Sequence, residues 1–108
     1  MMHTCHAVDC KEHVPPRLLM CRRHWFMVPE ELRGNVEKTF VSGQERSKKP
    51  TFLYLLNASL AIAEVAEKEG KTQYAQVHRE AAARWAARLI ALKPEGRELL
   101  RRYAASRR

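Results

Sequence analysis

Residues 5–24 read CHAVDCKEHVPPRLLMCRRH, a stretch that contains all three cysteines of the 108-residue chain. Cys5 and Cys10 form one pair in it, and Cys21 and His24 form a second pair with two residues between them. Structural zinc ions take four thiolate or imidazole ligands, usually supplied by the chain as two such close pairs. Because residues 3–28 show no sustained helical or strand periodicity, we expect residues 1–28 to be a loop-rich module that folds around one structural zinc ion held by these four side chains.

The ligand set has alternatives at this point. His3, His6 and His13 are close enough in the sequence to take the place of His24, which we prefer because of its pairing with Cys21. The cysteines could also be unligated thiols, whereas a disulfide is disfavoured by the odd cysteine count and by the reducing compartment that we expect. A catalytic zinc ion is disfavoured as well, because it needs an open coordination position and the predicted set of four ligands is complete.

The remainder of the chain has helical patterning. Pro29, followed by two acidic residues, predicts the start of a short helix, which Leu32, Val36 and Phe40 continue at four-residue spacing. A polar loop then completes the segment 29–50.

Residues 51–108 are predicted to form a basic helical hairpin with a short terminal helix. The apolar stripe of its first helix consists of Leu53, Leu56, Leu60 and Ala63. The stripe of its second helix consists of Tyr74, Val77, Ala81, Trp85, Leu89 and Leu92. Gly70 favours the end of the first helix, Thr72 is suited to cap the second, and the short connection favours antiparallel packing. Pro94 then starts a last helix that contains Leu99, Leu100 and Tyr103.

These elements predict a mainly α protein in one compact unit: a zinc-binding module, a short helix with a polar loop, and a helical hairpin. The second hairpin helix is rich in alanine between residues 81 and 91. An Ala-rich helix face could support a homodimer.

The charge of the chain is concentrated in its C-terminal part. Residues 1–70 carry ten Lys and Arg against nine Asp and Glu, a net charge of +1, whereas residues 71–108 carry ten against three, a net charge of +7. Such asymmetry favours an anionic partner, with nucleic acid as the first candidate. The candidate contacts are Arg79, Arg84, Arg88, Arg97, Arg101 and Arg102. The competing interpretation is a solvated basic face that only keeps the protein soluble.

Three large apolar side chains, Trp25, Phe26 and Met27, directly follow the last predicted ligand. The structural interpretation is an apolar bridge that packs the zinc module against the helices. The functional interpretation is a platform on which nucleic-acid bases stack.

The first 45 residues resemble a group of small proteins encoded by bacteriophages and prophages. The matching residues are Cys5, His6, Cys10, Val14 to Pro16, Met20 to Pro29, Leu32 and Gly43 to Glu45. In that group an Arg-Pro pair commonly precedes the Gly-Gln pair, whereas Val41 and Ser42 stand there in this chain. The resemblance implies a phage-related, zinc-stabilised module.

Together these features predict a nucleic-acid-binding accessory protein. The alternative is a non-enzymatic interaction module that binds and modulates a host protein, and a zinc-dependent nuclease is a distant third. No run of apolar residues is long enough to span a membrane, and Met1 to Cys10 does not resemble a secretory signal. We therefore expect the protein in the cytoplasm.

Overall fold

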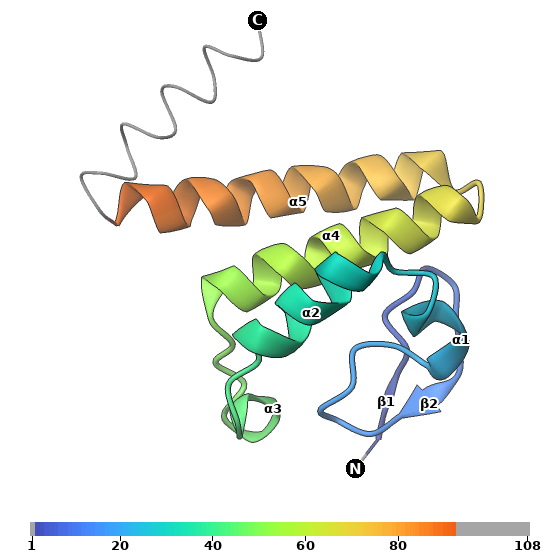
Figure 1. The fold of residues 1–108 in the computed structure, drawn as a ribbon, viewed down its shortest axis with the longest axis horizontal. Helices are drawn as coiled ribbons and strands as arrows, with labels where there is room; N and C mark the ends of the chain where they lie inside the picture. The colour runs from blue at the N-terminus through green and yellow to red at the C-terminus, as the bar shows by residue number, and fades with distance from the viewer. Residues whose placement is uncertain (1, 93–108) are drawn as a thin grey trace, which may run out of the picture.

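The computed structural model describes residues 2–92 of the chain. In order, the elements are β1 (His3–Thr4), β2 (His13–Val14), α1 (Arg22–Trp25), α2 (Glu30–Thr39), α3 (Gln44–Ser47), α4 (Phe52–Lys68) and α5 (Thr72–Ala91). Most of the described chain is helical, with a small strand and loop region at its N-terminal end, so the prediction of a mainly α protein is confirmed (Figure 1). The predicted last helix around Leu99, Leu100 and Tyr103 lies outside the described residues.

The N-terminal region has little regular structure. Strands β1 and β2 pair antiparallel over two residues each, with His3 opposite Val14 and Thr4 opposite His13. The backbone of Cys5 adds one more bond next to this ladder, because its N–H donates to the carbonyl of Glu12 at 2.7 Å. The strands thus fix the start of the loop that carries the first two cysteines.

Helices α4 and α5 form the long side-by-side pair in Figure 1. Thr51 caps α4, with its hydroxyl oxygen accepting a hydrogen bond from the backbone N–H of Tyr54. At the other end Gly70 has a φ of 77°, and the N–H groups of Gly70 and Lys71 donate to the carbonyls of Glu67 and Ala66. This is the Schellman arrangement, which needs a left-handed residue after the helix, and it explains why glycine stands there.

The predicted role of Thr72 as a helix cap is wrong. Thr72 is already the first residue of α5, and the residue before the helix is Lys71, which makes no side-chain capping bond. The reason is the tightness of the turn: the chain leaves the Schellman arrangement at Lys71 and enters α5 at once.

The face that α5 turns toward α4 also differs from the prediction. Ala75 and Ala82 are its buried residues, while Tyr74 and Val77 of the predicted stripe are 52% and 55% exposed. Small side chains let two helix backbones approach closely, which the larger residues would prevent. Trp85 stays half-buried because its ring stacks on Phe52, at 5.5 Å between centroids.

The segment predicted as a polar loop contains the short helix α3. Gly43 precedes this helix with a φ of 86°, a conformation that glycine adopts without strain. Gln44 is buried, and its side-chain oxygen accepts a hydrogen bond from the backbone N–H of Val41 at 2.8 Å. A local polar contact therefore orders part of this segment.

One apolar cluster connects the N-terminal region to the helices. Its buried members are Cys5, Ala7, Val14, Leu19, Met20, Val28, Val36, Ala58, Ala61, Ile62 and Val65. They come from the N-terminal loops, from α2 and from α4. In the described part of the chain, no helix is long and apolar enough to cross a membrane.

Candidate metal centre

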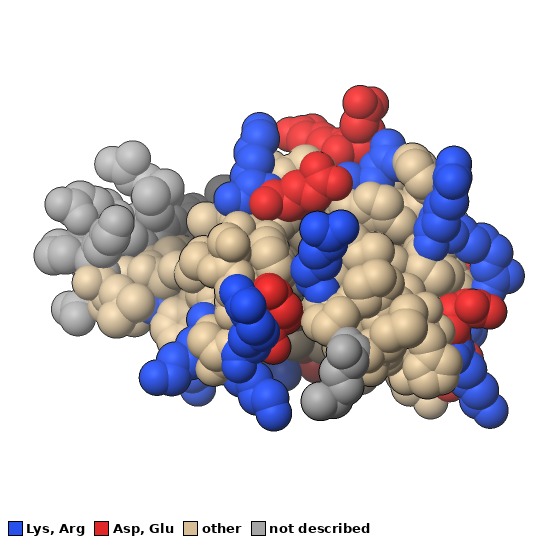
Figure 2. All heavy atoms as spheres, turned by 90° about the horizontal axis from the view of Figure 1, so that it is seen from below, with Lys and Arg blue, Asp and Glu red and all other residues tan. Residues whose placement is uncertain are grey.

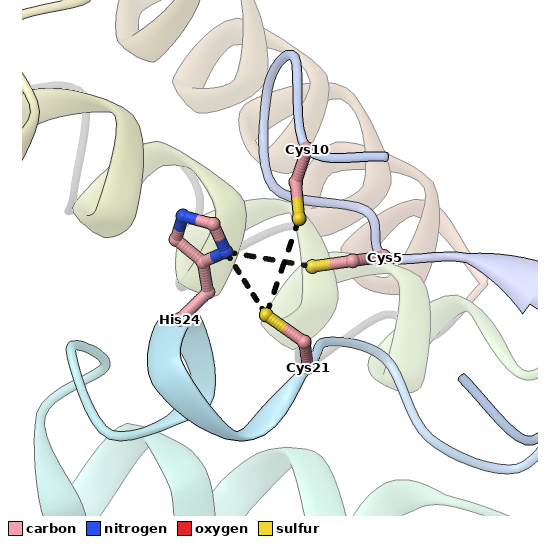
Figure 3. Close-up of side chains that lie close together, drawn as sticks. All are labelled: Cys5, Cys10, Cys21 and His24. Carbon is pink, nitrogen blue, oxygen red and sulfur yellow. Dashed lines mark hydrogen bonds between the residues drawn. The ribbon is translucent and has the colours of Figure 1, made fainter. Parts of the chain in front are cut away.

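Four side chains from the N-terminal region converge on one point (Figure 3). The sulfur atoms of Cys5, Cys10 and Cys21 and a ring nitrogen of His24 all lie within 4.8 Å of one another. The Nδ1 atom of His24 is 3.2 Å from the sulfur of Cys21 and 3.7 Å from that of Cys5. The sulfur atoms of Cys10 and Cys21 are 4.0 Å apart. The arrangement is compatible with a metal ion bound between the four atoms.

Local backbone geometry places each of the four residues. Cys5 follows β1 directly, and the chain then turns back through Asp9, which has a left-handed φ of 66°. Aspartate tolerates this conformation better than most residues do. The turn is closed by the N–H of Cys10, which donates to the carbonyl of Ala7 at 3.1 Å. The loop thus brings Cys10 back toward Cys5.

The second pair depends on the four-residue helix α1. Cys21 precedes α1 in an extended conformation, and His24 is the third residue of the helix. Residues three apart lie on the same side of a helical turn. Cys21 and His24 therefore face the same point, as their spacing predicted.

The site is largely removed from solvent. Cys5 is 4% exposed and His24 is 2% exposed, while Cys10 and Cys21 are half-buried. The other candidate ligands lie elsewhere: the rings of His3 and His6 contact each other at 4.9 Å, and His13 is exposed on β2. Among the described residues, the group of side chains that could hold a metal ion includes none of these three histidines. His24 is thus the histidine that the fold brings to the cysteines.

A fifth residue, Glu69, contacts the site from the far end of α4. Its Oε2 atom lies 3.2 Å from Nε2 of His24, the ring nitrogen that points away from the sulfur atoms. When Nδ1 binds a metal, the proton resides on Nε2 and donates to this carboxylate. Such a partner holds the ring in place and makes the imidazole a stronger ligand. No local pattern in the sequence marks Glu69 as a partner of His24, because the two residues stand 45 positions apart.

The turn between α4 and α5 makes further contacts with the same region. The ammonium group of Lys71 donates to the carbonyl of Val8 at 2.7 Å and lies 3.3 Å from Oε1 of Glu69. The ammonium group of Lys68 donates to the carbonyl of Met27. Three neighbouring side chains of the hairpin thus bind the loops that carry the four donors.

The two pKa values that change most at the site shift in opposite directions. Burial raises the pKa of the Cys5 thiol to about 11. Burial acts in the same sense at Cys21, but hydrogen bonds from the backbone and ring of His24 outweigh it and lower the pKa of that thiol to about 7. Burial also acts to raise the pKa of Glu69, yet its hydrogen bonds with His24 and Lys71 lower it. The Cys21 thiol and the Glu69 carboxyl therefore lose their protons more readily than the free side chains do.

The predicted nucleic-acid contacts differ from one another in their exposure and in the side chains that they contact. Arg79 forms an ion pair with Glu67, and the guanidinium of Arg88 lies 5.5 Å from the centroid of the Trp85 ring. Arg84 is exposed on α5. Arg97, Arg101 and Arg102 lie outside the described residues. Figure 2 shows one face of the molecule, where basic side chains are separated by wide areas of other residues and accompanied by acidic groups.

The apolar segment after His24 divides into two parts. Trp25 and Met27 pack against the core cluster, as the bridge interpretation requires. Phe26 does not, because 62% of its side chain is exposed.

Comparison with known proteins gives no relative: no protein-family model, curated protein or solved structure matches the chain.

Proposed function

We propose that the chain is a zinc-stabilised, non-enzymatic nucleic-acid-binding protein, of the accessory type that phages and prophages encode. The observation that carries the zinc assignment is the convergence of three cysteines and His24, with Glu69 behind the imidazole. Three thiolates and one imidazole form a donor set that suits zinc and that occurs in its structural sites.

A structural role for the ion is supported by the completeness of the donor set. Four protein donors fill a tetrahedral site, whereas a catalytic zinc ion keeps one position for water or substrate. With three thiolates, the Zn²⁺ centre carries a net charge of −1. The basic groups of Arg23 and Lys71 lie close by: an Arg23 nitrogen is 3.4 Å from Nε2 of His24, and Lys71 contacts Glu69. These cations reduce the electrostatic penalty of the buried anionic centre.

The nucleic-acid assignment rests on charge. The chain has a formal net charge of +8, of which +7 belongs to residues 71–108. Phosphate contacts from Lys and Arg supply most of the affinity of non-specific nucleic-acid binding, and they make it strongly salt-dependent. Arg84 and Arg88 on α5 are exposed members of this group in the described part of the chain.

The test combines a metal measurement with a binding titration. Native protein purified without chelators is expected to contain one zinc ion per chain by elemental analysis. The zinc-loaded protein is expected to bind labelled single- or double-stranded DNA or RNA, with an affinity that falls as salt increases. A metal-free preparation that keeps the same ordered N-terminal region overturns the zinc assignment, and the absence of any nucleic-acid affinity at low salt overturns the binding assignment.

A second candidate function is the binding of a host protein. The observation in its favour is the pair Tyr74 and Val77, which are exposed one helical turn apart on α5. An affinity purification from nuclease-treated host lysate separates the candidates. A stoichiometric protein partner that survives nuclease favours this second function, and loss of every partner favours nucleic acid.

A further inference from the structure

We infer that the groove beside Phe26 binds single-stranded nucleic acid, with an unstacked base against the Phe26 ring and the adjacent phosphates at the neighbouring arginines. The inference rests on the proposed function and adds a base-binding surface to the basic residues of the helical half. It gives a role to the one part of the segment Trp25–Met27 that does not pack in the core.

The position of α1 explains why Phe26 faces solvent. Cys21 and His24 fix the single turn α1, and Trp25 packs against the core cluster on its inner side. Phe26 ends this turn with a helical backbone conformation, so its side chain lies on the outer side. The ring is large, is 62% exposed and directly follows the helical turn that carries His24, so it offers a surface on which a base can stack.

Two arginines accompany the ring. The guanidinium of Arg33 lies 4.8 Å from its centroid, and that of Arg22 lies 5.8 Å from it. Within residues 2–92, neither of these groups forms an ion pair, and nor does the nearby Arg17. These cations remain available to phosphates, unlike Arg79, which is neutralised by Glu67.

A cavity of about 380 Å³ opens next to the ring. Leu18, Trp25, Phe40 and Tyr54 supply much of its apolar lining, and Arg17 and Arg22 supply positive charge. Glu37 is the acidic side chain among the described lining residues. An aromatic and apolar hollow flanked by unpaired arginines complements a nucleobase that is attached to a phosphate backbone.

Single-stranded nucleic acid fits this groove better than a duplex does. Stacking on a protein side chain requires the face of a base, which is covered in a duplex and free in a single strand. An acidic peptide would satisfy the arginines as well, but it carries no base that could stack on the exposed part of the Phe26 ring.

The experiment measures fluorescence anisotropy with the zinc-loaded full chain. The probes are a fluorescein-labelled oligothymidylate and an oligouridylate, each of about 12 nucleotides, a length within the range of single-strand sites. A labelled DNA duplex serves as the comparator. We expect Phe26→Ala to lower single-strand affinity about 5- to 150-fold, the effect typical of losing one stacked base. Phe26→Trp, which retains a stacking ring, is expected to keep wild-type affinity.

The salt dependence separates stacking from charge. Phe26→Ala should leave the slope of log affinity against log salt unchanged. Arg22→Gln and Arg33→Gln should each reduce that slope by about 0.7, the contribution of one phosphate contact to a single strand. Tyr74→Ala and Arg46→Gln are the matched controls, because they remove an exposed aromatic ring on α5 and an exposed charge on α3. Both controls should bind like the wild type.

The possible failures are distinguishable. If the wild type binds single strands and the Phe26 and arginine variants bind them equally well, the groove assignment is wrong and the proposed function stands. If the wild type binds neither probe nor the duplex at low salt, both are wrong. If Phe26→Ala alters only the oligomeric state in size-exclusion chromatography, the groove is a self-association surface and the inference is overturned. If Phe26→Ala loses zinc, the groove is tested by Arg33→Gln, a substitution on α2. A slope of log affinity against log salt equal to that of the wild type would then overturn the inference.

Discussion

The N-terminal region, residues 2–28, and the hairpin of α4 and α5 are ordered by different interactions. In the first, regular structure is limited to two-residue strands and one helical turn, and four side chains that could hold a metal ion lie close together. In the second, two helices of 17 and 20 residues pack along their length through small side chains. We expect burial of apolar surface to suffice for the hairpin, and the loops to gain further stability from a metal ion that links distant points of the chain.

The largest expected effect is the loss of the metal. Chelation, or Cys21→Ser, should disorder residues 2–28 while α4 and α5 remain helical, because the four candidate donors all lie in the first region. Zinc supplies about 10–16 kcal/mol in metal-dependent peptide domains. Amide NMR spectra and far-UV circular dichroism measure the two regions separately.

A matched pair of histidine variants checks the ligand assignment in the same experiment. His24→Ala should behave like Cys21→Ser, and His13→Ala, on the exposed part of β2, should keep one zinc ion per chain. If the N-terminal amide signals stay dispersed in His24→Ala, the region does not depend on the metal as proposed.

The next effect concerns the link between the two regions. Glu69→Gln should lower zinc affinity about 10- to 100-fold, the range typical for the loss of a carboxylate that supports a metal-bound histidine. Competition with a chromogenic chelator measures this change. Glu67→Gln is the control, since Glu67 pairs with Arg79 on the hairpin itself. Equal zinc affinities for the two variants would show that Glu69 does not support the metal site.

The third prediction addresses the hairpin alone. Ala82→Leu should lower the free energy of unfolding by about 1–3 kcal/mol, because the larger side chain does not fit the close contact with α4. Ala83→Leu, at an exposed position on the same helix, should change it by less than about 0.5 kcal/mol. Urea denaturation measures both, and zinc content should stay at one ion per chain. A zinc content that falls in Ala82→Leu would contradict the separation of the two regions.

The smallest expected effect distinguishes the two threonines next to the hairpin helices. Thr51→Ala should lower the free energy of unfolding by about 1 kcal/mol, because the residue caps α4. Thr72→Ala should have less effect, since Thr72 makes no capping bond. Denaturation of both variants under the same conditions provides the check, and equal losses would contradict the capping assignment.

The fold was predictable where the sequence carries a local signal. The helical character of α4 and α5 and the glycine that ends α4 follow from apolar periodicity and backbone preference. The short helix α3 and the inner face of α5 could not be predicted from these local signals. Helix α3 depends on the buried contact of Gln44. The inner face of α5 depends on which residues are small enough for close helix packing.

The sequence by itself indicated Cys5, Cys10, Cys21 and His24 as candidate metal donors, because Cys21 and His24 stand at a spacing that lets both side chains face one point. The fold then brought His24, and none of the three other candidate histidines, to the cysteines. The sequence also determined the charge asymmetry, which is a property of composition. Only the tertiary structure decided that Glu69 supports His24, that Lys68 and Lys71 bind the loops, and that Phe26 faces solvent. These features arise from the packing of segments far apart in the chain, and no local pattern of residues encodes which distant surfaces will meet.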